Sequence, residues 1–123
     1  MPGRILLIDD DAILCSELID ILREEGYSAS SISNSKEAIA AVMADNYDLY
    51  LLDYKMEGMT GIDLLKILRE KNLKSPVLFI SGKPNLDKLV KREDVAQYVS
   101  GFMEKPFEID ELLKRIRELL SKE

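Results

Sequence analysis

Short apolar segments alternate with amphipathic segments along the whole chain, and this alternation constrains the fold more than any other feature. Residues 5–8, 49–52 and 77–80 are almost entirely apolar. Apolar runs of this length are typical of strands that are buried on both faces of a parallel sheet. Strands that alternate with helices predict an α/β fold with right-handed crossover connections.

Two weaker segments complete the predicted sheet. Residues 27–32 alternate between apolar and polar positions, as in an edge strand, and residues 101–103 form a short fifth strand. We therefore predict a doubly wound, five-stranded parallel sheet with the order 2-1-3-4-5. The switch point of this order lies beside strand one, so the ends of strands one and three flank a crevice.

The segments between these strands carry apolar residues at helical spacing. Helices are expected over residues 12–25, from residue 35, after Gly61, around residues 86–90 and over residues 109–120. Gly26 is expected to end the first helix and Ser35 to cap the second. Residues 55–60 are expected to form a turn-rich loop.

The bulk properties restrict the class of protein. With 123 residues, the chain corresponds to one domain over residues 1–123. The net charge of −6 argues against direct nucleic-acid binding. No apolar run approaches the roughly 18 residues of a membrane span, and Met1 leads into a strand without a signal peptide, so we expect a cytoplasmic protein. The absence of histidine excludes histidine triads and histidine-ligated zinc, and the lone Cys15 excludes an internal disulfide.

Polar residues stand at the ends of four of the predicted strands. Asp9 and Asp10 follow strand one, Asp53 follows strand three, Ser81 closes strand four, and Lys105 follows strand five. Because the carboxyl ends of parallel strands meet at one edge of the sheet, we expect these side chains to converge. Three carboxylates, a hydroxyl and an ammonium suit a divalent cation together with a phosphoryl group.

The chemistry of such a cluster can be worked out from its charges. Two carboxylates about 4 Å apart repel by about 4 kcal/mol at an effective dielectric near 20. A divalent cation relieves this repulsion, and Mg²⁺, for which Mn²⁺ can substitute, prefers oxygen ligands. Asp53 is expected to be ionised at neutral pH and to attack phosphorus without a general base, giving an aspartyl phosphate. Lys105 can pair with Asp53 before the reaction, and Ser81 can donate to a phosphoryl oxygen.

Four motifs carry a resemblance to a known family: Ile8-Asp9-Asp10-Asp11, residues 52–61, Ile80-Ser81-Gly82 and residues 102–107. In this order and spacing, the chain resembles a receiver domain of bacterial two-component response regulators over essentially its whole length. The resemblance implies the flavodoxin-like (βα)5 fold of the chemotaxis regulators. It also implies that Asp53 is phosphorylated by a sensor histidine kinase or a histidine phosphotransfer protein, as in a phosphorelay.

The resemblance implies a metal site as well. Asp10 would bind Mg²⁺ directly, and Asp9 would bind it mainly through water. Asp53 and the backbone carbonyl of Lys55 would complete the protein ligands. The proline usual in the following loop is replaced by Glu57.

The resemblance also implies residues that bind the phosphoryl group and a residue that changes conformation when it is bound. Ser81 and Lys105 would hold its oxygens, and the peptide bond between Lys105 and Pro106 would be cis. Phe102 occupies the position of an aromatic switch that turns inward when the Ser81 hydroxyl moves toward the phosphate. Because Phe102 lacks the hydroxyl of the more common tyrosine, such a switch would act by packing alone.

The predicted function is a phosphorylation-dependent signalling receiver that switches its partner-binding face and catalyses only its own phosphorylation and dephosphorylation. Gly82 leaves room for a water in line with Asp53, so the aspartyl phosphate is expected to be short-lived. One alternative is an interaction module on the same fold that works without phosphorylation. Another is a phosphatase, which would need an aspartate where Lys55 stands. The output is either a downstream protein or a covalently attached domain.

Simpler interpretations also stay open for several residues. Asp11 can merely cap the first helix, and Phe102 can merely pack in the core. Cys15 is expected to be a small helix residue without a role. Basic residues after the fourth strand form either a solvated face or a partner surface: Lys83, Lys88, Lys91 and Arg92.

Overall fold

The computed structural model describes residues 3–72 and 74–121. Its elements in chain order are β1 (Arg4–Ile8), α1 (Ala12–Glu24), β2 (Ser28–Ile32), α2 (Ser35–Ala44), β3 (Leu49–Leu52), β4 (Lys55–Met56), β5 (Met59–Thr60), α3 (Gly61–Glu70), β6 (Val77–Ser81), α4 (Leu86–Arg92), the 3-10 helix η1 (Ala96–Tyr98), β7 (Gly101–Glu104) and α5 (Ile109–Ser121). The predicted absence of a signal peptide at Met1 lies outside the described residues.

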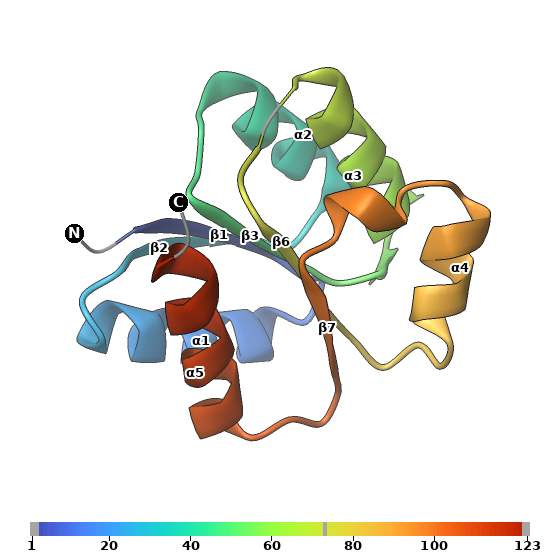
Figure 1. Ribbon diagram of the computed structural model, residues 1–123. Helices are drawn as coiled ribbons and strands as arrows, with labels where there is room; N and C mark the ends of the chain where they lie inside the picture. The colour runs from blue at the N-terminus through green and yellow to red at the C-terminus, as the bar shows by residue number, and fades with distance from the viewer. Residues whose placement is uncertain (1–2, 73, 122–123) are drawn as a thin grey trace.

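Five of these strands form one parallel sheet in the order β2-β1-β3-β6-β7. Helices α1 and α5 cover one face of this sheet, and α2, α3 and α4 cover the other (Figure 1). The short strands β4 and β5 form a separate two-stranded sheet, so the main sheet has the predicted order 2-1-3-4-5. The predicted doubly wound α/β fold is confirmed.

The central strands send alternate side chains to opposite faces of the sheet. Leu6 and Ile8 of β1 pack in a core layer beneath α2, α3 and α4. Ile5 and Leu7 pack in the layer beneath α1 and α5. All four side chains are fully buried. Burial on both faces explains why these strands are continuous apolar runs rather than alternating ones.

The strand register determines which residues meet at the carboxyl edge. Ile8 of β1 is paired with Leu52 of β3, and the next residue of each strand is an aspartate. The N–H of Asp53 donates to the carbonyl of Ile8 at 2.9 Å. On the other side of β3, the N–H of Lys105 donates to the carbonyl of Ser81 at 3.0 Å. The register therefore brings the ends of four strands together.

The predicted cap of α2 is wrong by one position. Ser35 is the first helical residue, and Asn34 precedes it in an extended conformation with φ −136° and ψ 152°. The side-chain oxygen of Asn34 accepts a hydrogen bond from the N–H of Glu37 at 2.8 Å. Serine and asparagine are similarly good caps, so composition alone does not choose between adjacent candidates.

The predicted loop over residues 55–60 contains the hairpin β4–β5, in which Lys55 pairs with Thr60. Gly58 supplies the positive φ of 89° in its turn. Thr60 then begins α3 with a capping box: its hydroxyl accepts from the N–H of Asp63 at 3.2 Å, and its N–H donates to the Asp63 carboxylate at 2.9 Å. The capping box thus fixes the C-terminal end of the segment that follows Asp53.

Candidate functional site

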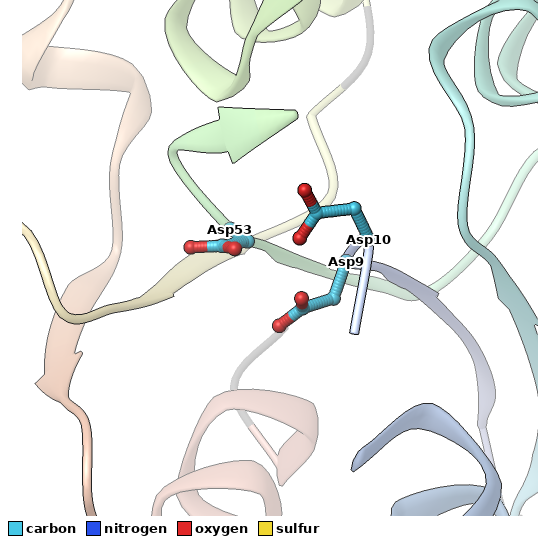
Figure 2. A group of neighbouring side chains, drawn as sticks. All are labelled: Asp9, Asp10 and Asp53. Atoms are coloured by element: carbon cyan, nitrogen blue, oxygen red, sulfur yellow. The ribbon is translucent and has the colours of Figure 1, made fainter. Parts of the chain in front are cut away.

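Three aspartates gather at the ends of β1 and β3 (Figure 2). Each of Asp9, Asp10 and Asp53 offers a carboxylate oxygen, and these three atoms lie within 4.8 Å of one another. Asp9 and Asp53 are buried, whereas Asp10 is exposed. The structure therefore brings together the three carboxylates that the sequence placed at strand ends.

Both carboxylate oxygens of Asp9 have partners within the protein. One oxygen accepts from the N–H of Asp11 at 3.0 Å, and the other accepts from the ammonium of Lys105 at 2.7 Å. Such bonds are needed because a charge removed from water is strongly unfavourable unless it is paired. Asp11 itself caps α1 by accepting from the N–H of Leu14 at 3.1 Å, which confirms its simpler interpretation.

Lys105 lies between two of the aspartates. Its ammonium is 2.7 Å from Asp9 and 3.5 Å from Asp53, so the predicted pairing with Asp53 exists, but Asp9 is the nearer partner. Burial alone would lower the pKa of Lys105, but the hydrogen bond and charge of Asp9, aided by Asp53, raise it above its ordinary value. The peptide bond from Lys105 to Pro106 is cis, as the resemblance implies.

The electrostatic environment of Asp53 favours its protonated form. Burial, followed by the charge of Asp9, raises the pKa of Asp53 from 3.8 to about 6, although Lys105 opposes this change. At pH 7 a carboxyl group with this pKa is still roughly nine-tenths ionised. The predicted nucleophile therefore needs no general base at neutral pH.

The donor set also fits a divalent cation. Asp9, Asp10 and Asp53 supply hard oxygen atoms, and Lys105 brings one positive charge to these three carboxylates. Mg²⁺ binds such carboxylates while keeping several waters. The exposed position of Asp10 leaves one side of the cluster open to solvent.

Ser81 lies across the site from the aspartates. Its side chain is buried, and its hydroxyl oxygen accepts from the backbone N–H of Lys83 at 3.1 Å. A cavity of about 340 Å³ opens beside it. The cavity is lined by Asp53, Tyr54, Lys55, Ser81, Gly82, Lys83 and Lys105. A phosphoryl group on Asp53 would therefore meet both a hydroxyl and an ammonium.

The structure places Phe102 at the surface rather than in the core. Its side chain is 38% exposed, and its ring stacks on that of Phe79 with centroids 6.1 Å apart. Both rings border a second cavity of about 470 Å³, which Ser81 also lines. The interpretation of Phe102 as simple core packing is wrong. Its inward movement stays a prediction.

Gly61 is a site residue whose role was not found from the sequence. A Cβ atom at this position would lie 2.3 Å from the backbone oxygen of Asp53 and 2.7 Å from the ring of Phe79. Only glycine lets the start of α3 approach Asp53 this closely. The sequence showed that Gly61 follows Thr60 at the start of a helix. It did not show that Gly61 lies against the Asp53 backbone and the Phe79 ring.

Tyr54 and Lys83 were also missed as lining residues of the cavity. The ammonium of Lys83 lies 5.0 Å from the centroid of the Tyr54 ring. The sequence positions of both residues could have indicated this role, because Tyr54 follows Asp53 directly and Lys83 stands two residues after Ser81.

A comparison with known families agrees with this geometry. The family model described as the response regulator receiver domain matches residues 5–117. The chain belongs to this family. Among the described residues of this receiver domain, the helices are too short or too polar to cross a bilayer.

The receiver domain is also similar to individual bacterial regulators. The cell cycle transcriptional regulator CtrA of Caulobacter vibrioides is 34% identical over 113 residues, which are 92% of this chain and 48% of CtrA. The transcriptional regulatory protein YkoG of Bacillus subtilis is 33% identical over 118 residues, which are 96% of this chain and 51% of YkoG. The chain thus spans about half the length of these curated relatives.

Solved structures show the same architecture. A CheY-like receiver domain protein from Methanospirillum hungatei superposes with a TM-score of 0.89 at 26% identity, covering 98% of this chain and 95% of that chain. The response regulator TrrA of Thermotoga maritima, solved in complex with Mg²⁺ and BeF, superposes with a TM-score of 0.81 at 27% identity, covering 97% of this chain and 99% of TrrA.

Proposed function

We propose that this receiver domain accepts a phosphoryl group on Asp53 from a phosphohistidine donor and changes its partner-binding face in response. The main support is the position of Asp53, which is buried among two other carboxylates, a hydroxyl and an ammonium at the end of β3. Membership in the receiver family supports phosphorylation-dependent signalling as the general role.

In the proposed transfer, a carboxylate oxygen of Asp53 attacks the phosphorus atom. The bond from phosphorus to the donor breaks, and its electron pair stays with the leaving group. Lys105 stabilises negative charge on the transferring oxygens from its position 3.5 Å from the Asp53 carboxylate. Ser81 donates its hydroxyl to another oxygen after releasing its own hydrogen bond with the N–H of Lys83.

We propose Asp9, Asp10, Asp53 and the backbone carbonyl of Lys55 as the residues that would hold Mg²⁺, with Mn²⁺ as a substitute. A bound cation would neutralise the crowded carboxylates and the incoming phosphoryl group. Asp10 is the most accessible of the three side chains, which supports it as a direct ligand. TrrA, which was solved with Mg²⁺ and BeF, has the same fold, which supports the cofactor proposed here.

The proposed domain also hydrolyses its own aspartyl phosphate. A Cβ atom built at Gly82 would meet no atom within 4 Å, so there is space for water beside Ser81. Water attacks phosphorus, the bond to Asp53 breaks, and inorganic phosphate leaves with the proton that water releases. The domain would thus catalyse only its own phosphorylation and dephosphorylation, rather than turn over external substrates.

The proposed output depends on Phe102. The ring is partly exposed and borders the cavity of about 470 Å³. Movement of the Ser81 hydroxyl toward the phosphoryl group would free space beside that cavity, and Phe102 would turn inward to fill it. Such a shift needs about 5.5 kcal/mol of differential stabilisation to change a 1:99 population to 99:1.

The proposed partners follow from this role. The donor is a sensor histidine kinase or a histidine phosphotransfer protein, and the output is a downstream protein or a covalently attached domain. Because the chain covers about half of its relatives, both output arrangements are compatible with their lengths. The net charge of −6 disfavours nucleic acid as a direct partner. The domain is proposed to act in the cytoplasm without binding nucleic acid or membranes.

The experiment is intact mass measurement after incubation with a small acyl phosphate, with and without Mg²⁺. Wild-type protein should gain one phosphoryl group only with Mg²⁺, and Asp53→Asn should gain none. Quenching within seconds is needed because the product is expected to be short-lived. If no adduct forms on either protein, the alternative becomes an interaction module that works on this fold without phosphorylation.

A further inference from the structure

A third cavity lies at the amino ends of β6 and β7, at the opposite edge of the sheet from Asp53. Its volume is about 670 Å³, which is within the range of roughly 300–1,000 Å³ that is usual for small-molecule sites. Its walls come from the end of α3 and the segment after it, from η1 and from the C-terminal part of α5. We call it the amino-edge cavity. None of the residues assigned above to the phosphoacceptor site lines it.

The floor of the amino-edge cavity belongs to the hydrophobic core. Leu65, Leu68 and Val77 line the cavity, and each is at most 3% exposed. Tyr50 also lines it and is fully buried. The cavity therefore reaches from the surface down to core side chains. An apolar group placed against this floor would be removed from water, which is favourable.

Tyr50 brings a hydrogen-bond donor to this floor. Its hydroxyl oxygen accepts from the N–H of Tyr47 at 3.3 Å. Within residues 3–72 and 74–121, the hydroxyl itself donates to no protein atom. Burial raises the pKa of Tyr50 above its ordinary value, so the hydroxyl keeps its proton at neutral pH. A polar atom of a bound molecule would be able to accept from it.

The rim of the amino-edge cavity is positively charged. Arg69 and Lys74 line it, and no aspartate or glutamate is among its described lining residues. Within the part of the chain that the structure describes, neither cation forms an ion pair with a carboxylate. This local excess of positive charge contrasts with the net charge of −6 of the whole chain. Two cations without acidic partners favour an anion over a neutral molecule.

An aromatic ring holds the guanidinium of Arg69 in place. The guanidinium lies over the ring of Tyr98, 5.0 Å from its centroid. This contact uses the face of the guanidinium, so the N–H groups at its edge can still donate. Their fork geometry matches two oxygens of a carboxylate or a phosphate. Arg69 also offsets the dipole of α3 from its last turn, whereas Lys74 lies beyond the end of that helix.

We propose that the amino-edge cavity binds a small organic anion, whose carboxylate or phosphate contacts Arg69 and Lys74 and whose apolar body packs on Leu65, Leu68 and Val77. The cationic rim and the apolar floor recognise the two different parts of such a molecule. Because this cavity is separate from the phosphoacceptor site, the inference holds whether or not Asp53 is phosphorylated.

The test is a titration of the ¹⁵N-labelled chain with 2-naphthoate in a chelator, followed by the amide resonances in the NMR spectrum. The naphthyl ring supplies the apolar body, and the carboxylate supplies the charge. The amides of Leu68, Val77 and Ser100 should shift with one common Kd, because these residues line the amino-edge cavity. Nuclear Overhauser effects from the naphthyl protons to the methyl groups of Leu68 and Val77 should place the ring on the floor. Shifts confined to Asp53 and Ser81 would place the anion in the phosphoacceptor cavity and overturn the inference.

Three further probes separate the parts of the ligand. The neutral 2-naphthamide should bind about tenfold more weakly than 2-naphthoate, as expected for the loss of a charge-assisted contact. Inorganic phosphate should also bind more weakly, because it lacks the apolar body. The tighter binder of 2-naphthoate and 2-naphthyl phosphate identifies the anionic group. Equal affinities for 2-naphthoate and 2-naphthamide would mean that the cations do not take part, and the inference would be overturned.

Arg69→Gln and Lys74→Gln test the two cations separately. Each should weaken 2-naphthoate about five- to tenfold and leave the affinity for 2-naphthamide unchanged, a selectivity that a merely structural role would not produce. Arg92→Gln is the matched control, because Arg92 is also exposed in the last turn of its helix but does not line the cavity. It should leave both affinities unchanged.

Tyr98→Leu tests the ring that holds Arg69. It should weaken 2-naphthoate by releasing the guanidinium, whereas Tyr98→Phe keeps the ring and should bind like wild type. Equal weakening by Arg69→Gln and Arg92→Gln would mean that the anion responds only to overall charge, which overturns the inference. A wild-type chain that binds none of the four probes overturns it as well.

Discussion

Helices α3 and α4 cover the same face of the sheet but begin in very different ways. The ten-residue α3 starts at a capping box formed by Thr60 and Asp63. The seven-residue α4 starts after Asn85, which has a left-handed φ of 59° and makes no side-chain cap bond. A helix whose first N–H groups lack a cap opens more easily.

This difference separates the segment that carries the proposed phosphoacceptor, Asp53, from the segment that carries the proposed switch residue, Ser81. The Asp53 segment is held by the β4–β5 hairpin and by the close approach of Gly61. The Ser81 segment leads to the weakly capped α4, whose C-terminal end is tied to α3 by an exposed ion pair between Lys66 and Glu93. Exposed pairs of this kind stabilise little. This asymmetry is consistent with a site in which the Asp53 segment stays rigid during the proposed chemistry. The Ser81 segment and α4 are then the parts that can move in response.

The largest expected effect on stability concerns Gly61, which lies against the Asp53 backbone. Gly61→Ala forces a methyl group against the backbone oxygen of Asp53 and the Phe79 ring, which should destabilise the fold by about 3 kcal/mol. Gly82→Ala is the matched control, because its Cβ meets no atom within 4 Å and the change should be nearly neutral. Urea denaturation measures both. Equal destabilisation of the two variants would remove the argument for a close approach.

The second prediction concerns the pH dependence of stability. Because the pKa of Asp53 is raised from 3.8 to about 6, the folded state favours its protonated form. Ionisation of Asp53 therefore removes stability as the pH rises from about 4 to about 6, by up to about 3 kcal/mol. Without divalent cations, Asp53→Asn should gain stability over wild type across this range and keep the gain above it.

Urea denaturation in a chelator at pH 4 and pH 7 measures this effect. The stability difference between Asp53→Asn and wild type should be larger at pH 7. A difference that is the same at both values would mean that burial and Asp9 do not perturb Asp53 as described.

A somewhat smaller effect is expected from metal binding. A ligand that binds only the folded state at 100 times its Kd stabilises by about 2.7 kcal/mol. Millimolar Mg²⁺ should therefore raise the melting temperature of wild-type protein. Asp10→Asn should lose most of this increase with little change in the metal-free melting temperature, because Asp10 is exposed. An unchanged response in Asp10→Asn would remove this residue from the proposed ligands.

The smallest effects compare the two helix starts directly. Thr60→Ala removes the capping hydroxyl of α3 and should destabilise by about 1 kcal/mol. Asn85→Gly replaces a residue at a left-handed position and should change stability by less than about 0.5 kcal/mol in either direction. Hydrogen exchange should be faster in α4 than in α3. Slower exchange in α4 would reverse the comparison.

Much of the site could be predicted because its residues follow strand patterns that are local in sequence. Asp9, Asp53, Ser81 and Lys105 each stand at the end of an apolar run, and parallel pairing brings such ends to one edge. The nearer partner of Lys105 could not be predicted, because Asp9 and Asp53 are equivalent in pattern. The choice depends on where the backbone places each carboxylate.

The sequence by itself determined the doubly wound sheet, its strand order and the set of polar residues at its carboxyl edge. These features follow from apolar periodicity and from the general rules of parallel sheets. Only the tertiary structure decided the close approach of Gly61 to the Phe79 ring and the contact of Lys83 with Tyr54. Such features depend on distances of a few ångströms between segments that folding brings together, and periodicity in sequence carries no information about those distances.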